Sequence, residues 1–279
     1  MTSPPWLQRH PLLGYYAAVY AISWGGIVAV VGAGGFDLYH LRPFDTGMIF
    51  VAMLLGPSVG GLAMTAALDG RAGLRRLKLL CWHWRVDARW YAVALLTIPL
   101  LLIAVLWPLS TFVDTAFAPR FQWQLFAIGL IAGSFEEIGW TGFATPRLLA
   151  RQHWFMAGLS LGLTWAIWHL LVDFRQNFNS IGTIWLLQFV VLYVAALTPY
   201  RLLMTWVYAN TQSLFVAVLM HASYTGWLFV LYPATSFAQG LVWQFAFAVA
   251  LWLLVALVVA GRLHIARGVS QQKPQPRIG

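Results

Sequence analysis

The sequence has 279 residues, of which 61% are hydrophobic and only 9% are charged. A soluble domain carries about 25% charged residues, so this composition excludes a water-soluble globular protein and indicates a membrane protein. A net charge of +9 is compatible with a nucleic-acid partner, but the basic residues fall in short loops between apolar runs. That placement is typical of membrane topology, and we predict no nucleic-acid partner.

Apolar runs of about 20 residues predict the membrane-spanning helices, because about 20 helical residues cross the hydrocarbon core of a bilayer. The sequence contains eight such runs, which cover residues 11–33, 47–68, 90–113, 121–143, 154–172, 183–209, 212–231 and 238–262. The sixth run contains Pro199, which predicts a kink. The predicted fold is therefore an all-α, polytopic transmembrane bundle of about eight spans.

Charge in the loops predicts the orientation of the chain. Only Arg42, Arg120 and Arg175 fall in loops on the side opposite to the N-terminus, whereas the other basic residues, Arg201 among them, fall on the N-terminal side. Cytoplasmic loops are enriched in Lys and Arg, so both termini are predicted in the cytosol. Residues 73–90 mix basic with apolar side chains and are predicted to lie on the cytosolic membrane face, with a site for anionic substrates as the alternative.

The chain is predicted to form one transmembrane domain over residues 1–269, with a motif-bearing core at about 121–231. Residues 270–279 are polar and rich in Gln and Pro, which predicts a disordered C-terminal tail. The single cysteine, Cys81, excludes an intrachain disulfide. We expect an integral, multi-pass membrane protein, in the cell membrane if the source is prokaryotic, with membrane lipid as its surroundings.

Three groups of polar residues interrupt the apolar spans, and such residues are by default candidates for a functional site. Glu136 and Glu137 are adjacent in the fourth run, about 100° apart around a helix, so they face different neighbours. Burial and mutual repulsion strengthen the basicity of at least one carboxylate, which suits a general base. His169 lies in the fifth run, and His221 and Thr225 share a helix face in the seventh.

Each group alone also has a structural explanation, as a carboxylate pair bonded to a basic partner or as a histidine satisfied in the core. Their depth in the membrane favours a common role. The fourth and fifth runs are expected to form an antiparallel hairpin, and Glu136 and His169 are equally distant from its polar turn at 147–153. With His221 near the middle of its own run, the sequence predicts a catalytic cluster of one carboxylate and two histidines.

These residues, in this order, resemble the CPBP or Abi family of intramembrane CAAX and bacteriocin-processing proteases. The family motifs are Glu-Glu-x-x-x-Arg, aromatic-x-x-x-His and His-x-x-x-Asn on successive helices, and Trp165 supplies the aromatic residue of the second. The resemblance covers about residues 130–230. It implies an intramembrane endopeptidase acting on a membrane-associated peptide or protein substrate, CAAX-like or bacteriocin-like.

The resemblance also implies a role for each matching residue. Glu136 would activate a water molecule, and His169 would help to hold and polarise it. His221 and Thr225 would stabilise the tetrahedral oxyanion, and Glu137 would be structural.

Two positions depart from the family pattern, because Thr141 replaces the motif arginine and Thr225 replaces the motif asparagine. Glu137 thereby loses its expected ion pair. The Thr141 hydroxyl, four residues further along the same helix face, or a charge from Arg201 or Arg147 could take its place. The departures leave two alternatives open: a catalytically weakened relative that acts as a membrane binding, scaffold or immunity protein, and a small transporter.

The need for a metal is open at this stage. Glu136, His169 and His221 are also a ligand set for zinc, as in His₂Glu sites. The sequence lacks His-Glu-x-x-His, the motif that would favour zinc strongly. A glutamate–water mechanism without metal fits the same three residues, so no cofactor is predicted beyond this zinc alternative.

Overall fold

The computed structural model describes residues 4–32, 42–174 and 182–271, with side chains through residue 261. Of the predicted tail at 270–279, all but the first two residues lie outside the described residues. Elements η2, η3 and η5 are 3-10 turns, and η4 and η6 are π-helical. In chain order the elements are α1 (Pro5–Arg9), α2 (Pro11–Val31), α3 (Pro43–Cys81), α4 (Ala88–Phe112), η2 (Thr115–Phe117), η3 (Trp123–Leu125), α5 (Phe126–Gly139), η4 (Trp140–Ala144), α6 (Thr145–Leu149), α7 (Trp154–Trp168), η5 (Gly182–Ile184), α9 (Trp185–Phe189), η6 (Val190–Leu197), α10 (Thr198–Thr211), α11 (Leu214–Val230) and α12 (Phe237–Gln271).

All eight predicted apolar runs coincide with helical segments, which confirms a polytopic helical bundle. Within the described residues, six helices are long and apolar enough to cross a membrane: Pro11–Val31, Pro43–Cys81, Ala88–Phe112, Trp154–Phe174, Gly182–Thr211 and Phe237–Gly261. Of the other two runs, one forms the shorter apolar helix α11, and the other falls on η3, α5 and η4. The number of eight spans and the cytosolic termini stay predictions.

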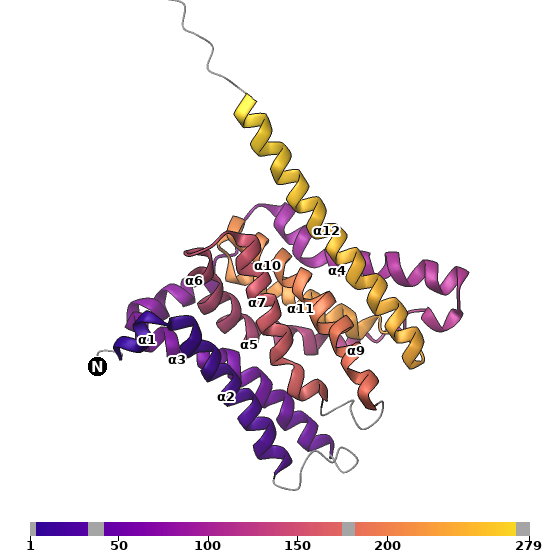
Figure 1. Cartoon of the computed structure of the whole chain (residues 1–279), viewed down its shortest axis with the longest axis horizontal. Helices are drawn as coiled ribbons and strands as arrows, with labels where there is room; N and C mark the ends of the chain where they lie inside the picture. The colour runs from indigo at the N-terminus through magenta and orange to yellow at the C-terminus, as the bar shows by residue number, and fades with distance from the viewer. Residues whose placement is uncertain (1–3, 33–41, 175–181, 272–279) are drawn as a thin grey trace, which may run out of the picture.

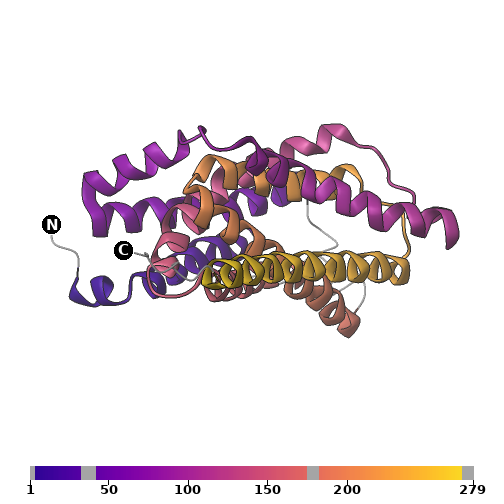
Figure 2. The same cartoon turned by 90° about the horizontal axis from the view of Figure 1, so that it is seen from above.

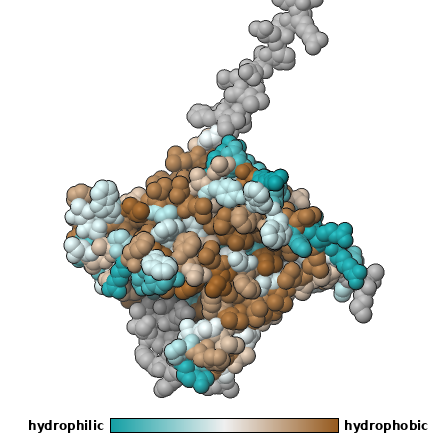
Figure 3. Space-filling view, turned by 180° about the vertical axis from the view of Figure 1, so that it is seen from behind, coloured by the Kyte–Doolittle hydropathy of each residue, from teal (hydrophilic) through white to brown (hydrophobic). Residues whose placement is uncertain are grey.

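The outer surface of the bundle is apolar. Figure 3 shows hydrophobic side chains spread over much of one face of the molecule. Leu100, Trp107 and Leu253 are among the large apolar side chains that stay exposed, at 60%, 69% and 62%. Water would disfavour a surface of this kind, whereas lipid chains match it. The chain is therefore an integral, multi-pass membrane protein.

Helices α5 and α11 pack backbone against backbone in the middle of the bundle (Figure 1). A Cβ atom added at Gly129 would lie 2.4 Å from the Gly226 nitrogen, and one at Gly133 would lie 2.7 Å from the Val218 carbonyl oxygen. Small residues permit this approach, which is typical of membrane helices. The contact places the end of α5, with its two glutamates, beside His221 of α11.

We expect Gly129→Ala to reduce the free energy of unfolding in detergent by about 1–3 kcal/mol, because the added methyl would overlap main-chain atoms that cannot rotate away. Gly25→Ala in α2 is the matched control, since nothing lies within 4 Å of its added Cβ. That variant is expected to be neutral or more stable by up to ~1 kcal/mol, the gain in helix propensity. Thermal unfolding followed by circular dichroism measures both, and equal losses would contradict the packing argument.

Two π-helical segments adjoin prolines. We predicted a kink at Pro199, and the structure has π-helix η6 ending two residues before it, while η4 ends two residues before Pro146. Proline lacks an N–H and its ring crowds the preceding turn, so a widened turn accommodates it. Such π segments are frequent at functional sites. Here η4 begins three residues after Glu137, and η6 carries Tyr193, which packs on His169.

Helix α3 is interrupted at Gly70, whose φ of 61° and ψ of −153° lie outside the helical region. Figure 2 shows the helix changing direction near one end of the bundle. Residues 73–90, which are predicted to lie on the cytosolic membrane face, comprise the end of α3, a connection and the start of α4 at Ala88. Beside the break, Asp69 accepts a hydrogen bond from Arg147 of α6 at 2.6 Å, which ties the end of the span to the bundle.

Candidate active site

The adjacent glutamates lie in the last turn of α5, and both are buried, Glu136 at 6% exposure and Glu137 at 0%. They face different neighbours, as the helix geometry predicted. Glu136 points to Trp165 on α7, and Glu137 points to Arg201 on α10 and His221 on α11. Figure 1 shows α5, α7, α10 and α11 grouped in the middle of the bundle, so the cluster lies at its centre.

Glu137 accepts hydrogen bonds from three side chains. The Arg201 guanidinium binds both carboxylate oxygens at 2.8 Å, His221 Nδ1 lies 2.7 Å from Oε1, and the Thr141 hydroxyl donates to Oε2. A buried carboxylate is stable only when charge and hydrogen bonds compensate for lost hydration, and this set provides both. The predicted contact with Thr141 is confirmed, and Arg201 supplies the positive charge. Arg147 instead pairs with Asp69.

Arg201 is 1% exposed and lies inside the bundle, held by its bidentate bond to Glu137. Its assignment to the cytosolic loop charges is therefore wrong. The physical reason is that an arginine in an apolar helix is stable when a buried carboxylate neutralises it. Removing Arg201 from the count leaves the bias of the loop charges toward the N-terminal side intact.

Glu136 is held differently from its neighbour. Within the described part of the chain, only the Trp165 indole donates a hydrogen bond to it, from Nε1 to Oε2 at 2.9 Å. Its other oxygen, Oε1, lies 4.0 Å from His221 Nε2. Glu136 thus keeps hydrogen-bonding capacity on the side that faces His221, which is what a general base requires.

His169 caps the end of α7 and is half-buried. Its Nδ1 lies 2.9 Å from the Trp165 carbonyl oxygen, and its ring stacks on Tyr193 with centroids 4.8 Å apart. Trp165 therefore links the two predicted catalytic groups, with its indole on Glu136 and its carbonyl on His169. Among the described residues no hydrogen bond joins His169 to Glu136 directly.

Thr225 lies one turn after His221 on α11 and is half-buried. In the regions that the structure covers, no hydrogen bond joins its hydroxyl to the other members of the cluster. Its predicted contribution to an oxyanion site remains a prediction.

The zinc alternative does not fit the geometry. Among the residues whose positions are described, no group of three His, Cys, Asp or Glu side chains could hold a metal ion. Glu136 is engaged by Trp165, and His221 directs Nδ1 to Glu137 rather than to a shared centre. We therefore derive no step through a metal.

The sequence analysis named Arg201 as one of two possible charged partners of Glu137 but counted it among the loop charges, although its position inside a long apolar run was a signal for burial. It did not single out a second buried residue of this region. Asp173, four residues after His169, is 2% exposed and accepts a hydrogen bond from Trp185 Nε1 at 2.5 Å. The predicted fifth span ended at residue 172, one residue short of it.

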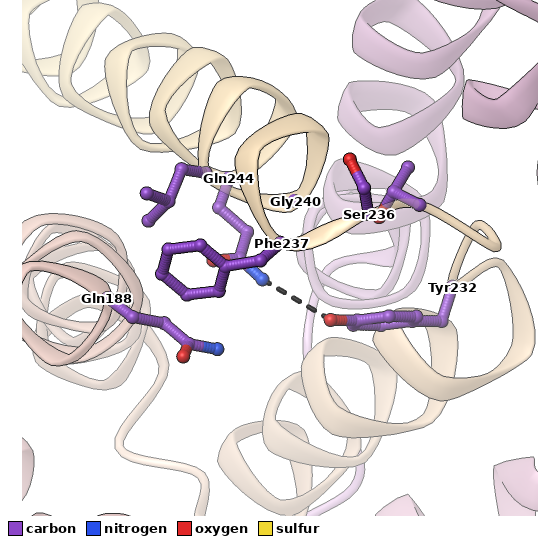
Figure 4. A pocket seen from close by; sticks show the side chains of 8 residues that line it. Gln188, Tyr232, Ser236, Phe237, Gly240 and Gln244 are labelled. Atoms are coloured by element: carbon purple, nitrogen blue, oxygen red, sulfur yellow. Dashed lines mark hydrogen bonds between the residues drawn. The ribbon is translucent and has the colours of Figure 1, made fainter. Parts of the chain in front are cut away.

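A cavity of about 180 Å³ lies elsewhere, between α9 and the start of α12 (Figure 4). Gln188, Tyr232 and Gln244 line it, and the Gln244 amide donates to the Tyr232 hydroxyl at 3.4 Å. None of its lining residues belongs to the glutamate–histidine cluster.

The fold and the site together define a polytopic helical membrane protein with a buried carboxylate–histidine cluster. Residues 118–227 match the family model of type II CAAX prenyl endopeptidase Rce1-like proteins. A protein of Methanococcus maripaludis named CAAX prenyl protease 2 is 31% identical over 113 residues, 38% of this chain and 40% of the relative. The chain thus matches about two fifths of the length of that curated relative.

The resemblance to the CPBP and CAAX-protease family is confirmed over this central region. All the residues predicted for the site fall inside the matched range: Glu136, Glu137, Thr141, Trp165, His169, His221 and Thr225.

Proposed function

We propose that this chain is an intramembrane endopeptidase that hydrolyses peptide bonds of membrane-associated peptides or proteins. The observation that carries the proposal is Glu136, held by Trp165 and facing His221 Nε2 across 4.0 Å inside the bundle. The similarity of residues 118–227 to type II CAAX prenyl endopeptidases supports the same activity.

The hydrogen bonds indicate which nitrogen of each histidine carries the proton. Both oxygens of Glu137 accept from Arg201, so the carboxylate is ionised and His221 Nδ1 is the donor. A carbonyl oxygen only accepts, so His169 Nδ1 donates to Trp165. In the neutral form of each imidazole the lone pair then lies on Nε2, and His221 turns that atom toward Glu136.

The gap between Glu136 and His221 suits a nucleophilic water. At 4.0 Å the two atoms are too far apart for a direct hydrogen bond, and one water would bridge them. Such a water donates one hydrogen to each acceptor, so its oxygen lone pair is free to attack a substrate carbonyl carbon. Glu136 takes the proton as the new C–O bond forms, and delivers it to the leaving amine as the C–N bond breaks.

The remaining roles follow from position. Thr225, one turn after His221, is the candidate hydroxyl donor to the oxyanion, and removing such a donor costs about 10²–10³ in rate. His169, oriented by the Trp165 carbonyl and the Tyr193 ring, is the candidate alternative to His221 as acceptor of the water's second hydrogen.

The departure at Thr141 does not weaken this proposal. Glu137 still has a positive partner, because Arg201 binds it from α10. The two rival functions, a binding or scaffold protein without catalysis and a small transporter, both predict that no peptide is cleaved.

The test is peptide cleavage by the purified full chain in proteoliposomes. Three substrate classes separate the alternatives: peptides with a prenylated CAAX terminus, the same peptides without the lipid, and bacteriocin-type leader peptides. We expect cleavage of at least one class, detected by mass spectrometry, and its loss in His169→Ala and His221→Ala. Absence of cleavage in every class, or equal product from wild type and both variants, would overturn the assignment.

A further inference from the structure

Arg201 of α10 contacts two different arms of the site. Its guanidinium nitrogens bind both oxygens of Glu137 at 2.8 Å, and its guanidinium carbon lies 3.9 Å from the centroid of the Trp165 ring. At 1% exposure the Arg201 side chain is almost fully buried inside the bundle. A charge over an aromatic face in such a place contributes about 2 kcal/mol or more, which is enough to hold a ring in one orientation.

The first arm runs from Arg201 to His221. The arginine keeps Glu137 ionised and in place, and Glu137 accepts from His221 Nδ1 at 2.7 Å. This bond selects the tautomer with its lone pair on Nε2 and sets the plane of the ring. The Nε2 atom that faces Glu136 is therefore placed by a residue that does not touch it.

The second arm runs from Arg201 to Glu136. The arginine lies over the Trp165 ring, and the indole Nε1 of that ring donates to Glu136 Oε2 at 2.9 Å. The same tryptophan presents its carbonyl oxygen to His169. Arg201 is thus linked to the proposed base and to both histidines through Trp165 and Glu137.

We propose that Arg201 is the positioning residue of the site, which aligns Glu136 through Trp165 and His221 through Glu137. The role deepens the proposed peptidase function and rests on it. Position 141 is the place to which the charge can be relocated, because the Thr141 hydroxyl bonds the same Glu137 Oε2 atom that Arg201 Nη1 binds. An arginine there restores the first arm, whereas the stack on Trp165 belongs to α10 alone.

The experiment compares Arg201→Met, Arg201→Lys and the double variant Thr141→Arg/Arg201→Met. Arg147→Met is the control, since that arginine pairs with Asp69 outside the cluster. Two readouts are taken on the full chain in micelles. One is the ¹⁵N spectrum of labelled histidine, with His221 assigned by its loss in His221→Gln, and the other is kcat on the peptide cleaved by the wild type.

We expect Arg201→Met to lose the fixed Nδ1–H tautomer of His221 and at least ~10²-fold in kcat, since losing a carboxylate that fixes a histidine tautomer costs up to ~10⁴. Arg201→Lys is expected to have a kcat between those of the wild type and Arg201→Met, because an ammonium cannot bind both oxygens of Glu137 in one plane. The double variant is expected to regain the tautomer but only part of kcat, and Arg147→Met to retain both.

A wild-type tautomer in Arg201→Met would overturn the proposal. If that variant does not fold, a wild-type tautomer and kcat in Arg201→Lys would overturn it instead. The spectrum tests the positioning role even if no peptide is cleaved, so a failure of the proposed function is distinguishable from a failure of this inference.

Discussion

Replacing Glu136 by glutamine is expected to lower kcat for peptide hydrolysis by about 10²- to 10⁴-fold, the usual contribution of a positioned general base. Glutamine keeps the size of the side chain, and its amide oxygen can still accept from Trp165 Nε1. It cannot take a proton from water at neutral pH. The loss should therefore appear in kcat, measured from initial rates in proteoliposomes, with little change in KM.

Asp69→Asn is the matched control for this variant. Its carboxylate pairs with Arg147 beside the break in α3, outside the cluster. We expect that variant to cleave at the wild-type rate. Unchanged kcat in a folded Glu136→Gln protein would show that Glu136 is not the general base. It would also contradict the proposed water between Glu136 and His221.

Replacing Glu137 by glutamine is expected to reduce the free energy of unfolding by about 3–5 kcal/mol, because it leaves the Arg201 charge buried without a counter-ion. Thermal unfolding in micelles measures the loss. Asp69→Asn again provides the comparison, since its partly exposed pair with Arg147 should contribute only about 0–1 kcal/mol.

A double variant separates the ion pair from the packing. In Glu137→Leu/Arg201→Met neither charge remains, and apolar replacement of a buried pair is often neutral. Stability near wild type together with lost cleavage is therefore expected. A Glu137→Gln protein as stable as the wild type would contradict the assignment of Glu137 as the counter-ion of Arg201.

The sequence predicted the helical bundle and most of the cluster, because both depend on local patterns. Apolar runs locate helices directly, and the distance of Glu136 and His169 from their shared turn predicts similar depth. The hydrogen bond from Thr141 to Glu137 followed from four-residue spacing on one helix. These relations hold within one helix or between two helices that follow one another along the chain.

The partners that the sequence left undetermined lie far apart along the chain. Arg201 reaches Glu137 across 64 residues, and neither spacing nor hydropathy says which carboxylate an arginine in an apolar run meets. The rotation of α7 that points the Trp165 indole at Glu136 depends on packing at Gly158 and Gly162, where added Cβ atoms would lie 2.9 Å and 3.0 Å from the nearest atoms of α10. Three-dimensional packing, rather than local pattern, sets these contacts.

The position of Arg201 on α10 has a consequence for how the protein is made. The chain emerges from the ribosome N-terminus first, so α5 enters the membrane before the cationic partner of Glu137 has been synthesised. At about 5–20 residues per second, the 64 residues between Glu137 and Arg201 take about 3 to 13 s to synthesise. An arginine one turn away on the same helix would neutralise Glu137 at once. In this chain Glu137 of α5 is neutralised only after α10 has been synthesised, so the site is completed when the second half of the bundle is inserted.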